Sequence, residues 1–216
     1  MARKVLISLF LVFGIFYVFF INSIDSSLIM VFKLIPMLLL ITLAFTTKLP
    51  NKLPYQWLVS IGLIFCAIGD YTLQWFIVGL CFFLIGHIFY IFAFRTTSVA
   101  KTPLIVKIAL GVYCLFMVVW IAGSIFKEGD TILAIAVIAY MSIILTMGWT
   151  SFRTGSPFAI TGALLFIISD SILALDRFMF EVAYSHQLIM FTYYGAQFLF
   201  MLSITQYFNI RNKVVQ

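Results

Sequence analysis

Eight apolar runs dominate this sequence, and each is long enough to cross a hydrocarbon core of about 30 Å. The runs are Val5–Ile21, Leu28–Phe45, Tyr55–Trp75, Phe76–Phe94, Leu104–Phe126, Ile132–Phe152, Ala159–Leu175 and Leu188–Phe208. Of the 216 residues, 64% are hydrophobic and only 9% are charged, which excludes an ordinary soluble domain. Inside lipid the backbone must satisfy its own hydrogen bonds, so such runs form helices. The sequence predicts an all-α, polytopic membrane protein with eight transmembrane helices.

Basic residues fall unevenly on the two sides of this expected bundle. One side carries Arg3, Lys4, Lys48, Lys52, Arg95, Lys101, Lys107, Arg153, Arg211 and Lys213. The other side carries only Lys127 and Arg177. Cytoplasmic loops are enriched in Lys and Arg, and an even number of spans puts both ends of the chain on one side. We therefore expect both termini in the cytoplasm, and the net charge of +6 needs no nucleic-acid partner.

The chain reads as one domain over residues 1–216, because no linker rich in Pro, Gly or Ser divides it. The first apolar run has no small-residue cleavage site after it, so we interpret it as a retained span and not a signal peptide. The cysteines fall inside predicted spans without CxxC spacing, which argues against a disulfide framework or a thiolate metal site. They are Cys66, Cys81 and Cys114.

Asp70 and Asp170 lie within the apolar segments GLIFCAIGDYTL and GALLFIISDSIL, each eight residues after a glycine and three before a leucine. A carboxylate inside a membrane span is costly and by default indicates a functional site. The alternative is a pair of structural carboxylates, each hydrogen-bonded to Tyr, Ser or Lys on a facing helix.

The two aspartate segments also suggest an internal repeat. When they are aligned, Gly62 falls in register with Gly162, which suggests a parallel four-plus-four repeat of helices. Chance likeness between two apolar helices is the alternative there.

Three ionisable groups are expected at one depth. Lys33, Asp70 and Asp170 each lie about five residues, or roughly 8 Å, from the non-cytoplasmic end of a span. Four more polar residues lie near this level or deeper, namely Tyr193, Tyr194, Gln197 and His87. If these helices are neighbours, a polar pocket opens toward the non-cytoplasmic side.

Two carboxylates in an apolar pocket suit acid–base catalysis. Burial and a like-charged neighbour both favour the protonated carboxyl, so one Asp can act as a general acid. The other Asp, if ionised, can stabilise a developing cation or activate water.

The other ionisable residues each allow more than one role. Lys33 can bind the phosphate of a lipid headgroup, or it can extend toward the membrane surface or neutralise one Asp. His87 can shuttle protons or simply bond to a neighbouring helix. With only two His in the chain, a zinc-hydrolase site is poorly supported.

Five ordered motifs resemble the YhhN-type lysoplasmalogenase family of integral membrane enzymes. They are KLIP, IGDYTL, GLCFFLIGHIFYIFAF, GALLFIISDSILAL and YYGAQFLF, and they extend from the second to the eighth predicted helix. The resemblance implies an eight-helix ether hydrolase that cleaves the vinyl ether bond of lysoplasmalogens. The products would be a fatty aldehyde and glycerophosphoethanolamine or glycerophosphocholine.

The resemblance also implies roles for individual residues. The family's intramembrane aspartates match Asp70 and Asp170, and its lysine matches Lys33. Its remaining polar positions match His87, Tyr90, Tyr194 and Gln197. Vinyl ethers hydrolyse by proton transfer to carbon, so we expect Asp170 as the acid and Asp70 as the stabilising base. Lys33 would hold the phosphate, and the other residues would position water or the glycerol hydroxyls, with no metal or organic cofactor.

Two other classes of function compete with this interpretation. A proton-coupled transporter of lipids or small amphiphiles would use Asp70 and Asp170 as titrating groups. A non-catalytic membrane scaffold would need the same carboxylates only for folding. The charge pattern fits either an endoplasmic reticulum membrane or a bacterial inner membrane.

Overall fold

Helices make up nearly all of the described chain, which in this computed structural model comprises residues 2–21, 25–26, 28–48, 54–96 and 100–215. The first four helices are α1 (Ala2–Phe20), α2 (Ile29–Thr46), α3 (Pro54–Thr72) and α4 (Phe76–Arg95). Then come α5 (Leu104–Met117), the π-helical turn η2 (Val118–Ala122), α6 (Gly123–Lys127), α7 (Thr131–Ser151), the 3₁₀ turn η3 (Phe152–Thr154), α8 (Pro157–Phe178) and α9 (Ser185–Val215). The described residues contain no strand, which confirms the all-α prediction.

Within the described ranges, seven helical segments are long and apolar enough to cross a membrane. They are Arg3–Phe20, Ile29–Thr46, Phe76–Arg95, Leu104–Lys127, Thr131–Thr154, Pro157–Phe178 and Ser185–Tyr207. The fourth of these combines α5, η2 and α6 into one continuous segment. The other long helix is α3, which carries Gln56, Ser60 and Asp70 and has these three side chains buried among its neighbours. The chain is thus an integral, multi-pass membrane protein.

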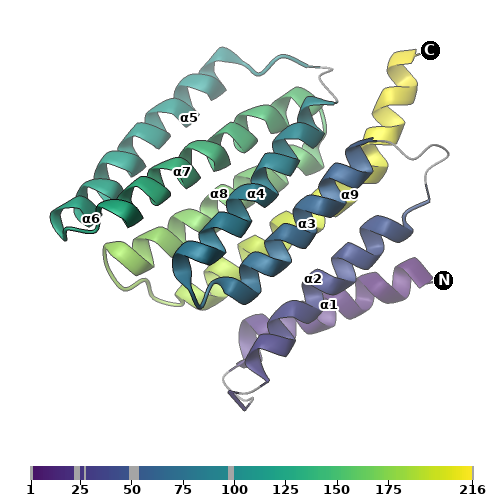
Figure 1. Ribbon diagram of the computed structural model, residues 1–216. Helices are drawn as coiled ribbons and strands as arrows, with labels where there is room; N and C mark the ends of the chain where they lie inside the picture. The colour runs from purple at the N-terminus through teal and green to yellow at the C-terminus, as the bar shows by residue number, and fades with distance from the viewer. Residues whose placement is uncertain (1, 22–24, 27, 49–53, 97–99, 216) are drawn as a thin grey trace.

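Successive long helices run in opposite directions, so the connections alternate between two ends of the bundle (Figure 1). The most extensive contacts join α3 to α4 and α8 to α9, and α4 packs on α7. The pair α1 and α2 packs against α3 and α9, while α5 lies at the opposite edge, mainly against α7. The N- and C-termini lie at the same end of the bundle (Figure 1).

Polar caps begin two of the helices. The Asp130 carboxylate accepts a hydrogen bond from the Leu133 N–H at the start of α7 (3.0 Å). At the start of α8 the Ser156 hydroxyl accepts from the Ala159 N–H (3.2 Å), and Pro157 occupies the first helical position. Such caps satisfy N–H groups that have no partner within the helix.

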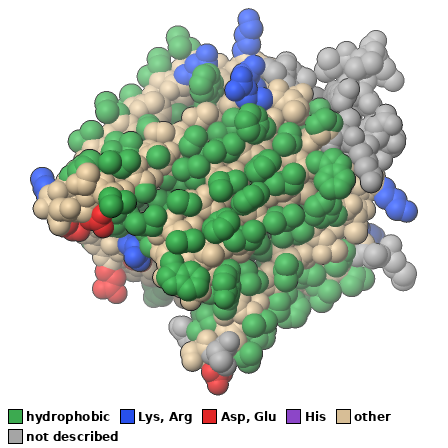
Figure 2. Space-filling model, in the orientation of Figure 1, with side chains coloured by type: hydrophobic (Ala, Val, Ile, Leu, Met, Phe, Trp, Pro, Cys, Tyr) green, Lys and Arg blue, Asp and Glu red, His purple; other side chains and the backbone are tan. Residues whose placement is uncertain are grey.

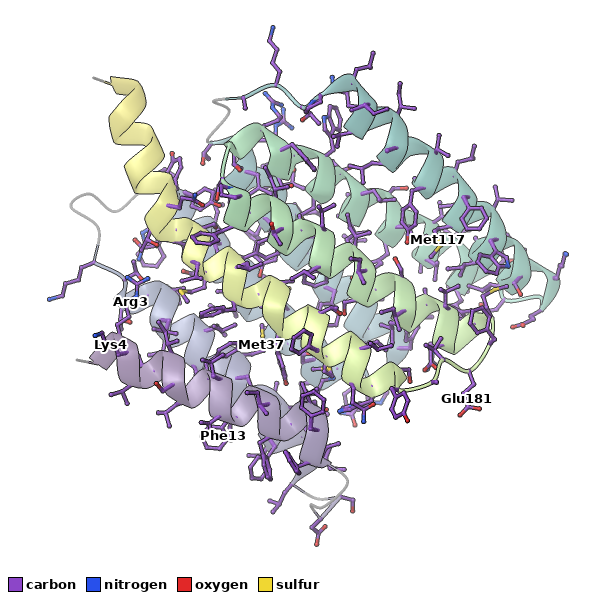
Figure 3. All side chains as sticks on the ribbon, turned by 180° about the vertical axis from the view of Figure 1, so that it is seen from behind. Arg3, Lys4, Phe13, Met37, Met117 and Glu181 are labelled. Carbon is purple, nitrogen blue, oxygen red and sulfur yellow. The ribbon has the colours of Figure 1, made fainter. Side chains whose placement is uncertain are left out.

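The face of the molecule seen in Figure 2 is broadly hydrophobic, with charged side chains toward its margins. Seen from behind, Arg3 and Lys4 lie at one end of the bundle and Glu181 at the other (Figure 3). Lys52 lies outside the described residues, as do the side chains of Arg211 and Lys213. A hydrophobic face of this kind is expected for helices in contact with lipid.

Glycines allow the central helices to approach closely. A Cβ at Gly62 would lie 2.4 Å from the ring of Tyr90, which places α3 directly against α4. In the second close pair, a Cβ at Gly162 of α8 would lie 2.9 Å from the ring of Phe200 on α9. Small residues at such contacts are typical of membrane helices, because packing and not hydrophobic burial drives their association.

The Gly62→Ala variant should therefore be less stable than the wild type, by about 1–3 kcal/mol. Tyr90 is fully buried and cannot retreat without disturbing its own packing. The matched control is Gly111→Ala on α5, where an added Cβ meets nothing within 4 Å. Thermal unfolding in detergent measures the difference. Equal stability of the two variants would contradict the close packing of α3 on α4.

Candidate active site

A cavity of about 90 Å³ lies among the central helices and reaches toward the α3–α4 connection. Most of its lining is apolar. Its polar lining consists of Lys33, Asp70, Tyr113, Tyr140, Ser169, Asp170, Ser171 and Tyr193. A cavity needs only about 10–15 Å³ of such volume to hold one water, so this one has room for several waters or for the reacting part of a larger molecule.

Asp70 occupies a fully partnered position near the end of α3. The Lys33 ammonium lies 3.5 Å from its Oδ1 and donates to its backbone oxygen (3.0 Å). The Tyr193 hydroxyl donates to its Oδ2 (2.6 Å). On the far side, the Tyr194 hydroxyl donates to the backbone oxygen of Lys33 (2.7 Å) and so ties α9 to α2. Asp70 thus has a cation and a phenol as neighbours.

Asp170 has a different environment on α8. The Tyr140 hydroxyl donates to its Oδ2, and no cation among the described residues pairs with it. The next residue, Ser171, is joined to the hydroxyl of Tyr113, which links α8 to α5. The two carboxylates line one cavity, but of the two only Asp70 has a counter-charge among the described residues.

A second polar cluster lies behind the cavity wall. The Tyr90 hydroxyl donates to Oε1 of Gln197 (2.6 Å), and both residues are fully buried. The His87 ring packs edge-on against Phe166 at 4.5 Å and Tyr140 at 5.5 Å between ring centroids. Neither ring nitrogen of His87, nor Nε2 of Gln197, has a hydrogen-bond partner among the described residues. Buried polar groups of this kind are uncommon and usually have a partner such as ordered water.

The structure brings Lys33, Asp70 and Asp170 together, as their equal depth predicts. The residues His87, Tyr90, Tyr194 and Gln197 do not line the cavity. Two of them contact residues that do line it. Tyr194 donates a hydrogen bond to the backbone of Lys33, and the ring of His87 packs against that of Tyr140.

Sequence reasoning missed Tyr113 and Tyr140, which come from α5 and α7. A signal for both exists, because a phenol deep inside an apolar span must find a partner for its hydroxyl. The sequence does not say which partner. Among the described residues, no three His, Cys, Asp or Glu side chains come together as metal ligands.

Residues 28–204 of the chain match the YhhN family. The chain is 36% identical to lysoplasmalogenase TMEM86A of Bos taurus over 164 residues, which cover 68% of this chain and 65% of that protein. The human TMEM86A is 35% identical over 163 residues, with the same coverage. A lysoplasmalogenase homolog of Dictyostelium discoideum is 30% identical over 201 residues, covering 73% of this chain and 66% of its own length. The match thus spans slightly less than two thirds of these relatives. No solved structure matches the chain.

Proposed function

Because this chain belongs to the YhhN family, we propose that it is a membrane-embedded lysoplasmalogenase, an ether hydrolase. Its substrate is a lysophospholipid with a vinyl ether at the first glycerol carbon. The products are a fatty aldehyde and glycerophosphoethanolamine or glycerophosphocholine. The observation that carries the proposal is a pair of carboxylates, Asp70 and Asp170, that line one largely apolar cavity and have one counter-charge between them in the described part of the chain.

The reaction requires a proton donor and then water. A proton moves from the enzyme to the outer vinyl carbon, and the adjacent carbon becomes part of an oxocarbenium ion. Water attacks that carbon and loses a proton, which gives a hemiacetal. The hemiacetal then breaks its bond to the glycerol oxygen, which takes up a proton, and the aldehyde leaves. Proton transfer from a positioned acid and electrostatic stabilisation of the cation are the two contributions that a protein can make.

The unlike surroundings of the carboxylates support a division of roles. No cation among the residues that the structure describes pairs with Asp170 to hold it ionised. Tyr140 donates to its Oδ2, so its Oδ1 is available to carry the proton. Asp70 is paired with Lys33, which favours the carboxylate that stabilises the oxocarbenium ion or accepts the proton of water. We therefore assign Asp170 as the acid and Asp70 as the base.

The other predicted residues assist the two aspartates indirectly, by positioning them or by binding water and substrate. Lys33 uses two contacts on Asp70, so one of its three N–H donors is left for a substrate oxygen. Tyr194 holds the backbone of Lys33 in place. The unpaired nitrogens of His87 and Gln197 offer partners to a water beside the cavity, and Tyr90 orients Gln197. The reaction so described needs no metal or organic cofactor.

We also propose the finer topology, namely eight spans in a single domain over residues 1–216, with both termini in the cytoplasm. The buried helix α3, third in chain order, would be the additional span that brings the total to eight. The positions of Arg3 and Lys4 opposite Glu181 support this orientation. A parallel four-plus-four repeat is supported by the two close pairs, α3 with α4 and α8 with α9. The host membrane would be the endoplasmic reticulum in a eukaryote and the inner membrane in a bacterium.

Release of aldehyde by the purified protein in detergent tests the proposed activity. We expect turnover of lysoplasmenylethanolamine or lysoplasmenylcholine, and none of the saturated ether analogue, because only a vinyl ether can be protonated at carbon. Detergent leaves no second compartment, so a proton-coupled transporter would release no aldehyde. A folded protein that leaves both vinyl ether substrates intact would therefore overturn the proposal in favour of transport or a scaffold.

A further inference from the structure

Arg177 lies in the last turn of α8, the helix that carries Asp170. Its guanidinium lies 4.1 Å from the ring centroid of Phe76 and 6.0 Å from that of Phe178. Its neighbour Asp176 accepts a hydrogen bond from the Val182 N–H (2.8 Å). No ion pair of Arg177 occurs among the described residues. The guanidinium is thus held by aromatic rings, and its N–H donors are left for a ligand.

The side chain of Phe76 lines two hollows. Together with Phe178 it lines the cavity that contains the two carboxylates. With Arg177, Trp75 and Leu133 it lines a second hollow, of about 340 Å³. Arg177 therefore neighbours the carboxylate cavity through its contact with Phe76.

The spacing of Arg177 from Asp170 matches the substrate of the proposed reaction. Arg177 follows Asp170 by seven residues, which is two helical turns, so both fall on one face about 10 Å apart along the axis. In a lysoplasmalogen about seven bonds separate the vinyl carbon that takes the proton from the phosphorus atom. At the roughly 1.2 Å per bond of an extended chain, they span about 8 Å. A substrate whose vinyl ether meets Asp170 can thus place its phosphate beside Arg177.

We propose that Arg177 binds the phosphate of the substrate headgroup, an inference that rests on the proposed function. The guanidinium presents a planar fork of donors that suits two phosphate oxygens. Stacking on Phe76 orients that fork at low entropic cost. The charge of the Lys33 ammonium, by contrast, is paired with Asp70, and only one of its donors is left for a substrate oxygen. Arg177 thus acts at the headgroup end of the substrate, and the carboxylates act at the vinyl ether.

The test compares Arg177→Gln with wild type on two substrates. One is lysoplasmenylcholine, and the other is 1-O-alkenylglycerol, which keeps the vinyl ether but lacks the phosphate. Arg177→Gln should raise KM for the first substrate about 10-fold. This is the smallest effect expected from losing a hydrogen bond to a charged group, and it is chosen because the site is exposed. It should leave kcat/KM for the second unchanged, and Arg177→Lys should fall between. Lys127→Gln is the matched control, since Lys127 lines a separate hollow. Equal losses on both substrates, or no difference from Lys127→Gln, would overturn the proposal.

A binding measurement separates this inference from the proposed reaction. The saturated ether analogue, 1-O-alkyl-lysophosphocholine, cannot react, and its dissociation constant should rise about 10-fold in Arg177→Gln. If the wild type releases no aldehyde but this difference is present, the reaction is refuted and the phosphate site stands. If aldehyde is released but the two dissociation constants agree, the site is refuted and the reaction stands. Displacement of the analogue by millimolar inorganic phosphate in wild type alone would indicate a free-anion site and overturn the headgroup assignment.

Discussion

Asp170→Asn is expected to lower kcat for lysoplasmalogen hydrolysis about 10³-fold, in the range typical of a lost general acid. The amide has nearly the same shape as the carboxyl and can still accept the hydrogen bond of Tyr140. It cannot transfer a proton to the vinyl carbon. The protein should therefore remain folded and retain affinity for the substrate while losing turnover. Aldehyde release under saturating substrate measures kcat directly.

The control for this variant is Glu181→Gln, which removes an exposed carboxyl in the α8–α9 connection. Its kcat should equal that of wild type. Binding of the unreactive saturated ether analogue shows whether the Asp170→Asn protein keeps its site. An Asp170→Asn protein that binds the analogue and still turns over within 10-fold of wild type would rule out Asp170 as the proton donor.

Lys33→Met is expected to destabilise the protein by about 3 kcal/mol, because it leaves the Asp70 carboxylate without a counter-charge. Asp70 is buried, and only 12% of the Lys33 side chain is exposed, so little solvent screens the pair. Activity should fall as well, since Asp70 would take up a proton and could no longer stabilise a cation. Thermal unfolding in detergent and aldehyde release measure the two effects.

The double variant Lys33→Met, Asp70→Asn distinguishes charge pairing from simple packing. With both charges removed, stability should return to within about 1 kcal/mol of wild type, while activity should remain lost. Lys48→Met, an exposed position just after α2, is the control and should change neither property. If the double variant is no more stable than Lys33→Met, the lost stability does not arise from an unpaired Asp70.

Much of the architecture could be predicted because the local residue composition is enough to identify membrane helices. A run of apolar residues must form a helix in lipid, and the rise per residue then sets the depth of each polar group. Depth placed Lys33, Asp70 and Asp170 in one layer, and the structure places all three on one cavity. The same reasoning expected Tyr194 and Gln197 near that layer, yet they face other neighbours, because depth does not specify the direction of a side chain around its helix.

The sequence by itself determined that the chain is helical, multi-pass and carries two carboxylates within apolar segments, because these properties depend on residue type and on distance along one helix. Only the tertiary structure decided that Lys33 pairs with Asp70 and that Tyr140 binds Asp170. It also decided that Phe76 both contacts Arg177 and lines the carboxylate cavity. These contacts join helices distant in the sequence, and they depend on how each helix is rotated and packed, which close approach at residues such as Gly62 and Gly162 controls.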